Sequence, residues 1–394
     1  MEGDNSYLEA TALAKLRRFP LKLVKGVPLM EPIADGWDIV ENFQAFPDDL
    51  IISTYPKAGT TWVQEIIDLI YNDGDAVKCQ RAPTFVRIPF LEIISPPPIP
   101  SGVELLNKMP RPRIIKTHLP FHLVPRSIWE NKCKVIYVAR NAKDNAVSYY
   151  HFDRMNKTQP DPGTWDQYIT KFIKGEVAWG PWSDHVKGYW AEKKTHQILY
   201  LFYEDLKEVR EGLATSPISC LIVLHLPSSD HTFTPASLSI SVLSGCSPRL
   251  SGSFHFHFVG SFQNPRQQTV KILDFLERVL PEDIIDKIVE LTSFSSMKNN
   301  PMANYTSFPK NLFDHSVSPF MRKGPSVLSS YFQWPGLPQQ VRSVTGRTIS
   351  PSSRDNSLTE RMHAGWMEWT SRSGTSSEWA QRGHSLIPRA ADRD

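Results

Sequence analysis

The stretch DDLIISTYPKAGTTWVQEIIDLIYN, residues 48–72, decides the fold. It opens with a short β-rich run over residues 48–56 and turns at Pro56. The residues after the turn carry apolar side chains at helical spacing: Trp62, Val63, Ile66, Ile67 and Ile70. The stretch therefore predicts a strand, a tight turn and an amphipathic helix, which is the repeating unit of α/β proteins.

Three further runs are typical of strands: PRIIKTHLP (residues 112–120), CKVIYVAR (133–140) and HQILYLFYEDL (196–206). The middle run is continuously apolar, as expected of a strand buried on both faces of a parallel sheet. A helix is expected over DNAVSYYHFDRM (144–155), and another over the amphipathic segment 269–280. This order predicts an α/β fold with a doubly wound, mostly parallel sheet, flanking helices and ligands at the carboxyl ends of the strands.

The amino-acid composition and the hydrophobic periodicity of the chain change twice. Residues 213–262 hold one acidic residue, one arginine and no lysine, and they show no sustained period of 3.6 or 2. Residues 325–394 hold no lysine, and their apolar residues are scattered. We expect a single domain over residues 1–324, interrupted by an insertion at 213–262, followed by a divergent and disordered tail at 325–394.

Composition limits the function classes. Across 394 residues, 44 Lys+Arg against 41 Asp+Glu give a formal charge of +3, so any anion site must be local and nucleic acid is not an expected partner. No run approaches the roughly 18 apolar residues of a membrane helix, and the N-terminus lacks a signal peptide's apolar core. Four cysteines are too few for a disulfide scaffold and lack metal-ligand spacing. These features favour a soluble cytoplasmic protein that binds no metal.

The turn after the first strand has features of a phosphate-binding site. Thr60 and Thr61 open the helix, where free backbone N–H groups and the helix dipole attract anions. Gly59 allows close backbone approach, and Lys57 adds a positive charge. The loop is not a Walker A motif, because its lysine precedes its glycine. An ordinary strand–turn–helix with a capping threonine remains the alternative.

Three other places carry candidate chemistry. Lys116 and His118 alternate at a strand end and share a face, so an imidazole base could act beside a charge-stabilising ammonium. Arg140 ends a buried strand and Ser148 follows two helical turns later, a pair that could hold a phosphate. The pair Arg322 and Lys323 could close on an anion. Each also fits a structural role: a core histidine, a helix-capping group and a surface pair.

Taken together, these segments resemble the cytosolic sulfotransferases, most closely the phenol-type family 1. The matching words are TYPKAGTTW, KTHLP, YVARNAKDNAVSYYHF, LFYEDLKE, TSFSSMKNNPMANYT and DHSVSPFMRKG, which cover most of residues 20–212 and 264–324. Members of that family have a P-loop-like α/β fold. They move a sulfonate group from 3′-phosphoadenosine 5′-phosphosulfate (PAPS) to a hydroxyl or amine of a small lipophilic acceptor, without a metal.

The resemblance implies a role for each matching residue. It makes His118 the general base, with Lys57 and Lys116 stabilising charge. It assigns acceptor contacts to Phe90, Lys116, His118 and Phe152. It assigns PAPS contacts to Lys57, Ala58, Gly59, Thr60, Thr61, Trp62, Arg140, Ser148, Tyr203, Thr292, Phe294, Arg322, Lys323 and Gly324.

The chain departs from the family after Gly324, where the expected GDWK-type segment, dimer motif and final helix have no counterpart. A monomer or weak dimer is therefore expected. Two alternatives stay open: a catalytically impaired isoform that binds PAPS, its desulfonated form PAP, or partner subunits without efficient turnover, and a nucleotide kinase on a related fold. The missing Walker A loop counts against the kinase.

Overall fold

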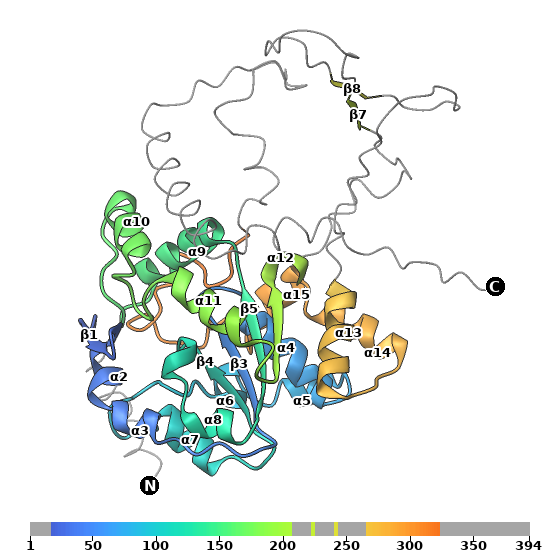
Figure 1. Cartoon of the computed structure of the whole chain (residues 1–394), viewed down its shortest axis with the longest axis horizontal. Coiled ribbons are helices and arrows are strands. Elements are labelled where there is room, and N and C mark those ends of the chain that lie inside the picture. The colour runs from blue at the N-terminus through green and yellow to red at the C-terminus, as the bar shows by residue number, and fades with distance from the viewer. Residues whose placement is uncertain (1–16, 207–221, 225–239, 243–264, 324–394) are drawn as a thin grey trace, which may run out of the picture. The chain divides into compact units, whose positions relative to one another are not determined.

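The computed structural model describes residues 17–206, 222–224, 240–242 and 265–323. At its centre is a parallel sheet of strand order β4-β3-β5-β6 (Figure 1). The strands are β3 (Leu50–Thr54), β4 (Ile114–Thr117), β5 (Lys134–Ala139) and β6 (Ile198–Phe202). Leu50 is in register with both Ile114 and Lys134, so the strand ends lie level across the sheet. The predicted α/β class with a parallel sheet is confirmed.

Alternate strand residues supply two separate cores. Leu50, Ile52 and Ile136 belong to one cluster, which α4 (Thr60–Tyr71), α13 (Pro265–Leu276) and α14 (Glu282–Leu291) complete. These three helices pack against one another on one side of the sheet (Figure 1). Ile51 and Tyr137 point to the opposite cluster, as the two-residue period of a strand requires. Both faces of the sheet are therefore covered, which is the doubly wound arrangement.

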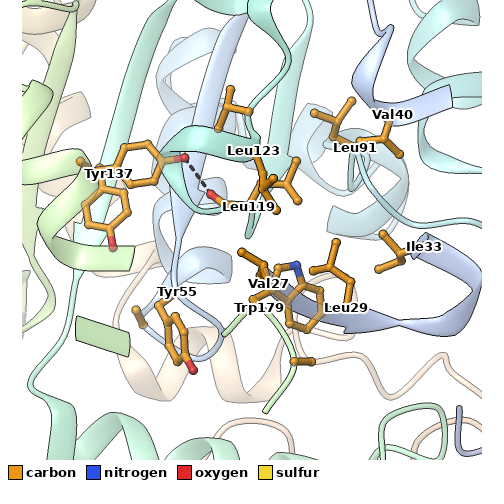
Figure 2. Packing of buried hydrophobic residues seen from close by; sticks show 14 of the residues in the cluster. Val27, Leu29, Ile33, Val40, Tyr55, Leu91, Leu119, Leu123, Tyr137 and Trp179 are labelled. Atoms are coloured by element: carbon orange, nitrogen blue, oxygen red, sulfur yellow. Dashed lines mark hydrogen bonds between the residues drawn. The ribbon is translucent and has the colours of Figure 1, made fainter. Parts of the chain in front are cut away.

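The second face is covered by an N-terminal unit and by later helices. The N-terminal elements are β1 (Leu21–Val24), β2 (Val27–Met30), α2 (Glu31–Asp35) and α3 (Trp37–Glu41), and the later ones include α10 (Trp165–Lys174) and α11 (Trp182–Glu192). Figure 2 shows their packing, in which Val27, Leu29 and Ile33 meet Leu91 and Trp179. This core fixes Trp179, which borders the candidate site described below.

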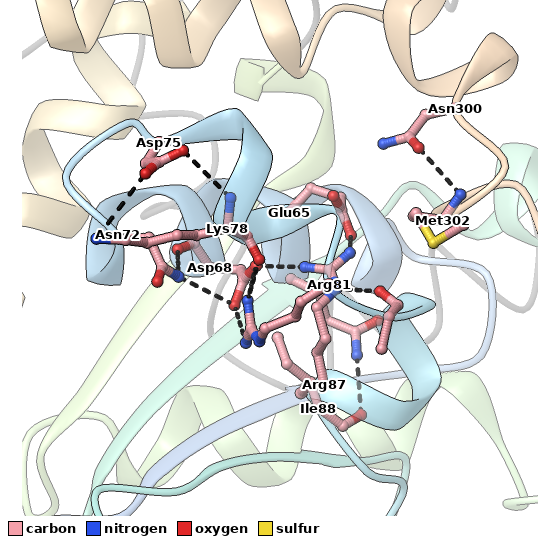
Figure 3. A network of polar contacts seen from close by, with 12 residues as sticks. Glu65, Asp68, Asn72, Asp75, Lys78, Arg81, Arg87, Ile88, Asn300 and Met302 are labelled. Atoms are coloured by element: carbon pink, nitrogen blue, oxygen red, sulfur yellow. Dashed lines mark hydrogen bonds and ion pairs between the residues drawn. The ribbon is translucent and has the colours of Figure 1, made fainter.

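The other elements that connect these layers are the long helix α9 (Ala142–Met155) and the shorter α5 (Ala76–Cys79), α6 (Thr84–Arg87), α7 (Gly102–Lys108), the 3₁₀ turn η1 (Phe121–Leu123), α8 (Arg126–Glu130), α12 (Tyr203–Leu206) and α15 (Phe294–Asn299). α6 is tied to α4 by a buried ion network (Figure 3). In it, Arg87 donates to Glu65 at 2.5 Å and to Asp68, and Arg81 donates to Asp68 from the rim at 2.8 Å.

Several predicted boundaries are corrected, and two of the corrections have a clear physical cause. The strand predicted over residues 196–206 ends at Phe202, because Phe202 pairs with Ala139, the last residue of β5, and the ladder stops there. Tyr203 instead begins α12. The helix predicted from residue 144 begins at Ala142, because the side chain of Asn141 caps it by accepting the N–H of Lys143.

The chain divides into two units, residues 1–207 with 264–369 and residues 208–263 with 370–394. In the second unit the structure describes the antiparallel pair β7 (Ile222–Leu224) and β8 (Ile240–Val242). The rest of the predicted insertion, Gly324 and the predicted tail lie outside the described residues. Within the described ranges, no helix has the length and apolar character to cross a membrane, and no group of His, Cys, Asp or Glu could hold a metal ion.

Candidate functional site

The loop between β3 and α4 is built on two left-handed residues. Lys57 has φ 67° and Gly59 has φ 109°. A Cβ atom on Gly59 would lie 2.6 Å from Cδ2 of Tyr203, so this position needs glycine both for its backbone and for its space. Because Gly59 is the N-cap of α4, no side chain caps the first turn. The N-terminus of α4 therefore keeps N–H groups for an anion, and buried Thr60 and Thr61 lie beside them.

Positive charge gathers at this loop. Burial lowers the pKa of Lys57 to about 7, and the nearby charges of Lys116, Arg140 and Arg322 act in the same direction. Asp153 opposes them. Cations crowd together in this way where a bound anion compensates them, and the predicted sites at Lys57, Arg140 and Arg322 thus come together in space.

Arg140 links the loop to the ring of Tyr203. Its Nη1 donates to the carbonyl oxygen of Lys57 at 2.9 Å, and its guanidinium lies 4.3 Å from the Tyr203 ring centroid. Trp62 meets the same tyrosine edge to face at 5.6 Å. Nε of Arg140 and Nε1 of Trp62 are both buried without a hydrogen-bond partner. Two orphaned donors beside an aromatic pair fit a ligand that carries both anionic groups and a flat ring.

His118 is held in one tautomer. Its Nδ1 lies 2.8 Å from the carbonyl oxygen of Thr54, which can only accept, so Nδ1 donates and Nε2 is left as the basic nitrogen. Burial lowers the pKa of His118 well below its usual range, and Lys116 adds to the effect. At neutral pH the imidazole is therefore uncharged and ready to accept a proton at Nε2.

Glu92 fixes the backbone of His118, and it was not predicted from the sequence. Its carboxylate accepts the N–H of His118 at 2.7 Å, the indole N–H of Trp179 at 3.0 Å and the hydroxyl of Thr117 at 2.9 Å. Burial raises the pKa of Glu92 to about 7. An acidic residue inside the apolar run PFLEII was the available signal, because an acid in such a run is buried only with partners.

His185 holds the backbone carbonyl of the same residue, His118. Its Nε2 donates to the carbonyl oxygen of His118 at 2.9 Å, while its Nδ1 accepts the hydroxyl of Tyr137 at 2.8 Å. Burial lowers the pKa of His185 to about 4, so it stays neutral in this role. The catalytic candidate is thus clamped from both sides by residues from distant parts of the chain.

Aromatic rings surround the two lysines. Phe90 lies 4.1 Å from Nζ of Lys116 and 4.8 Å, centroid to centroid, from the ring of His118. Nζ of Lys57 lies 4.5 Å from the ring centroid of Phe152 and 3.7 Å from that of Phe320. Phe320 was not predicted, although it stands in the matching word DHSVSPFMRKG. The predicted aromatic walls therefore border both lysines and the imidazole.

The other predicted cofactor-binding residues make few described contacts with the loop or with Arg140. Ala58 is buried in the loop. Nζ of Lys323 lies 5.8 Å from the ring centroid of Phe294. The hydroxyl of Thr292, the C-cap of α14, donates to the Ile288 carbonyl at 2.8 Å. Ser148 lies on α9, and no described contact joins its hydroxyl to Arg140.

Arg322 completes the cationic region. Burial lowers its pKa, and Arg140 and Arg154 lower it further, which places it among the same charges. Gly324, the last residue of the predicted donor set, lies outside the described residues.

Comparisons with known proteins bear on the family and the fold of the chain. The family model described as "Sulfotransferase domain" matches residues 47–212 and 241–327, together more than half of the chain. The gap in the match, 213–240, falls within the stretch that the sequence sets apart, whereas residues 241–262 belong to the second matched segment.

Two curated relatives are similar over most of their length. Sulfotransferase 1 family member D1 of Mus musculus is 49% identical over 301 residues, covering 76% of this chain and 83% of the relative. Sulfotransferase 1A1 of Bos taurus is 48% identical over 307 residues, covering 78% and 85%.

Solved structures share the fold at lower identity. Retinol dehydratase in complex with androsterone and the inactive cofactor PAP matches with a TM-score of 0.62 and 20% identity, over 92% of this chain and 94% of that one. Mouse sulfotransferase SULT7A1 complexed with PAP matches with a TM-score of 0.58 and 23% identity, over 93% and 99%.

Proposed function

The chain belongs to family 1 of the cytosolic sulfotransferases, and from that premise we propose that it moves a sulfonate group from PAPS to the hydroxyl of a small phenolic acceptor. The observation that carries the proposal is the contact between Nδ1 of His118 and the Thr54 carbonyl at 2.8 Å, which leaves Nε2 basic. PAPS, when bound, supplies the sulfonate and a phosphate leaving group.

The residues of the chain divide the work. The α4 N-terminus, Lys57 and Arg140 would bind the phosphates, and Trp62 would contact the adenine. Arg322 and Lys323 would close on the same phosphates. Phe90 and Phe152 would hold the acceptor ring, with its hydroxyl directed at Nε2 of His118. Catalysis of this kind rests on positioning and charge stabilisation.

At the base, His118 takes the proton of the acceptor hydroxyl at Nε2. Nδ1 stays protonated, and the Thr54 carbonyl stabilises the imidazolium that forms. Lys57 and Lys116 offset the negative charge that develops between acceptor and donor. A positioned base contributes about 10²–10⁴-fold and a charge-stabilising donor about 10²–10³-fold.

We expect His118→Ala and Lys57→Ala each to lower turnover by at least about 10²-fold while the protein stays folded. The measurement is transfer from labelled PAPS to a panel of phenols, with circular dichroism as the folding check. His122→Ala is the matched control, because His122 is exposed and stands outside the site. Retention of half the activity in either site variant would contradict the assignment.

Ligand specificity gives a second test. PAP carries a 3′-phosphate that ATP lacks, so PAP should raise the unfolding temperature far more than ATP at equal concentration. Stabilisation by PAP without transfer to any phenol would favour the impaired isoform, to which the divergent sequence after Gly324 lends support. That same divergence leads us to propose a monomer or weak dimer, which sedimentation would establish. The cytoplasm is the proposed compartment.

A further inference from the structure

The base stands on a corner of the chain whose backbone groups are bonded by side chains. β4 ends at Thr117, and the corner comprises the next two residues, His118 and Leu119. Their N–H groups donate to the Glu92 carboxylate at 2.7 Å and to the Thr117 hydroxyl at 3.0 Å, respectively. Both residues are buried, so their backbone groups need partners inside the protein.

The two carbonyl oxygens of the corner are held from a single helix. Nε2 of His185 donates to the carbonyl of His118 at 2.9 Å, and the hydroxyl of Tyr189 donates to the carbonyl of Leu119 at 2.9 Å. His185 and Tyr189 stand four residues apart on α11 and therefore share one face of it. Successive carbonyl groups of an extended strand point in opposite directions, so one helix reaches both because the chain turns at His118.

Tyr137 of β5 holds the two donors in place. Its hydroxyl donates to Nδ1 of His185 at 2.8 Å, which leaves the proton of that imidazole on Nε2. Its ring centroid lies 5.7 Å from that of His185 and 4.2 Å from that of Tyr189, and the ring is within 30° of parallel to both. All three side chains are fully buried. The donors are thus fixed by an inner strand of the sheet.

We propose that His185 and Tyr189 are positioning residues for sulfonate transfer, which act through the backbone of His118. This inference rests on the proposed function, in which Nε2 of His118 takes the proton of the acceptor. The bond from Nδ1 to the Thr54 carbonyl restrains the torsions of the His118 side chain, and the corner fixes the backbone from which that side chain starts. A displacement of about 1 Å at a reacting group can cost about 10²-fold in rate, so a loosened corner should slow transfer without weakening binding.

The geometry gives His185 no part in moving the proton itself. Its Nε2 proton is held by a carbonyl oxygen, and its Nδ1 accepts from the Tyr137 hydroxyl. Burial lowers the pKa of His185 to about 4, so the ring stays neutral near neutral pH. A variant at this position should therefore change the rate of transfer and not its dependence on pH. The titratable side chains that contact His185 or interact with its charge are Tyr55, Tyr137, Tyr189, His118 and His122.

The test measures single-turnover transfer from labelled PAPS to a phenol, with the full chain in excess over PAPS. His185→Asn keeps an amide beside Tyr137 but is too short to reach the His118 carbonyl. We expect its rate constant to fall by about 10- to 100-fold, with unchanged PAP affinity and an unchanged half-saturating phenol concentration. His185→Gln places an amide N–H where Nε2 stood, and it should recover the rate to within about threefold of the unmodified chain.

Two further variants localise the effect. Tyr189→Phe keeps the ring and loses the bond to Leu119, one residue beyond the base, and should slow transfer by about three- to tenfold. Ser127→Ala is the matched control, because buried Ser127 on α8 donates to the Phe43 carbonyl at 2.6 Å, the same kind of bond outside the corner. It should leave the rate constant unchanged although it too loses a buried hydrogen bond.

Three results would overturn the proposal. The first is an undiminished rate constant in His185→Asn. The second is an equal loss in Ser127→Ala, which would mean that transfer follows stability alone. The third is a changed pH profile in His185→Gln, which would mean that His185 carries a proton. If the His185 variants do not fold, Tyr189→Phe against Ser127→Ala decides.

Failure of the proposed function is recognised separately, because the unmodified chain would then transfer no sulfonate to any phenol. The corner is in that case tested by nitrogen-15 NMR of the His118 ring. The unmodified chain and His185→Gln should show the Nδ1–H tautomer alone. His185→Asn should show a mixture of tautomers, because its ring can leave the Thr54 carbonyl. A single, identical tautomer in all three proteins would contradict the role given to the corner.

Discussion

At the residue scale, Lys57 meets two opposing demands. Its ammonium must be charged to bind an anion, but burial makes the charged form unfavourable when no anion is present. Its pKa is lowered to about 7 by burial and then by Lys116, Arg140 and Arg322, with Asp153 opposing. Bound phosphates would raise this pKa again. Below about pH 7 the ammonium is already charged and PAP affinity should be constant. Above it, binding must take up a proton, so affinity should fall by up to about tenfold per pH unit.

Calorimetric titration of PAP between pH 6 and 9 measures this profile. Lys57→Arg, which stays charged throughout, should lose the fall between pH 7 and 8. Lys116, whose pKa is lowered to about 8, adds a second and later fall in both proteins. A flat profile in the unmodified protein would mean that Lys57 does not titrate in the binding step.

The residues proposed to act directly could be named from the sequence, because they stand in short segments with a chemical meaning. TYPKAGTTW indicates an anion loop, and KTHLP places an imidazole beside an ammonium. The residues that position them could not. Glu92 and His185 reach His118 from 26 and 67 positions away in the chain, and only the folded structure brings them into contact.

At the element scale, the β3–α4 turn depends on Gly59. An alanine there would hold φ near 109° and place its Cβ 2.6 Å from the Tyr203 ring. We expect Gly59→Ala to lower the free energy of unfolding by about 1–3 kcal/mol and PAP affinity by more than about tenfold, because the displaced ring contacts Trp62 and Arg140.

Gly26→Ala separates the two causes. Gly26 has φ +86° but nothing within 4 Å of a built Cβ, so it carries the backbone strain without the clash. It should cost about 1 kcal/mol and leave PAP affinity unchanged. Denaturant unfolding and calorimetry measure both variants. Equal losses of affinity in the two would show that the contact with Tyr203 is unimportant.

The α4–α6 junction depends on Arg87, whose side chain is 1% exposed between Glu65 and Asp68 (Figure 3). Arg87→Met would leave two buried carboxylates without that partner, and we expect it to cost about 3–5 kcal/mol of unfolding free energy. Arg81→Met removes the other partner of the Asp68 carboxylate, an arginine whose side chain is 47% exposed. It should cost at most about 1 kcal/mol of unfolding free energy. Similar losses in urea unfolding would show that burial is not what matters here.

Element order was predictable because each strand is a continuous apolar run and each helix has a periodic face. The boundaries of an element were not predictable where a neighbouring element decides them. β6 ends at Phe202 because β5 ends at Ala139, and nothing in the run LYLFYEDL announces that limit. Likewise, α13 begins at Pro265 and ends at Leu276, earlier than the amphipathic pattern over residues 269–280 predicts.

At the scale of the whole molecule, the first unit, residues 1–207 with 264–369, is assembled from two chain segments. α12 ends at Leu206 and α13 begins at Pro265, and the two helices pack together. The ends of the intervening stretch are thus already close in space. β7 and β8 within that stretch pair with each other, and they belong to the second unit. Removal of the intervening residues is therefore expected to leave the described elements of the first unit in place.

Deletion of residues 213–262 follows from this geometry. Shortening the connection from roughly 60 to roughly 8 residues reduces the entropy cost of closing it by about 2 kcal/mol, by the scaling of loop closure with length. We expect the shortened chain to unfold at higher denaturant concentration, to bind PAP with unchanged affinity and to transfer sulfonate at least as fast. Deletion of the tail, residues 325–394, is the comparison, because it leaves the connection between α12 and α13 as long as before. A shortened chain that loses PAP binding would show that the stretch, part of which the family model matches from residue 241, contributes to the site itself.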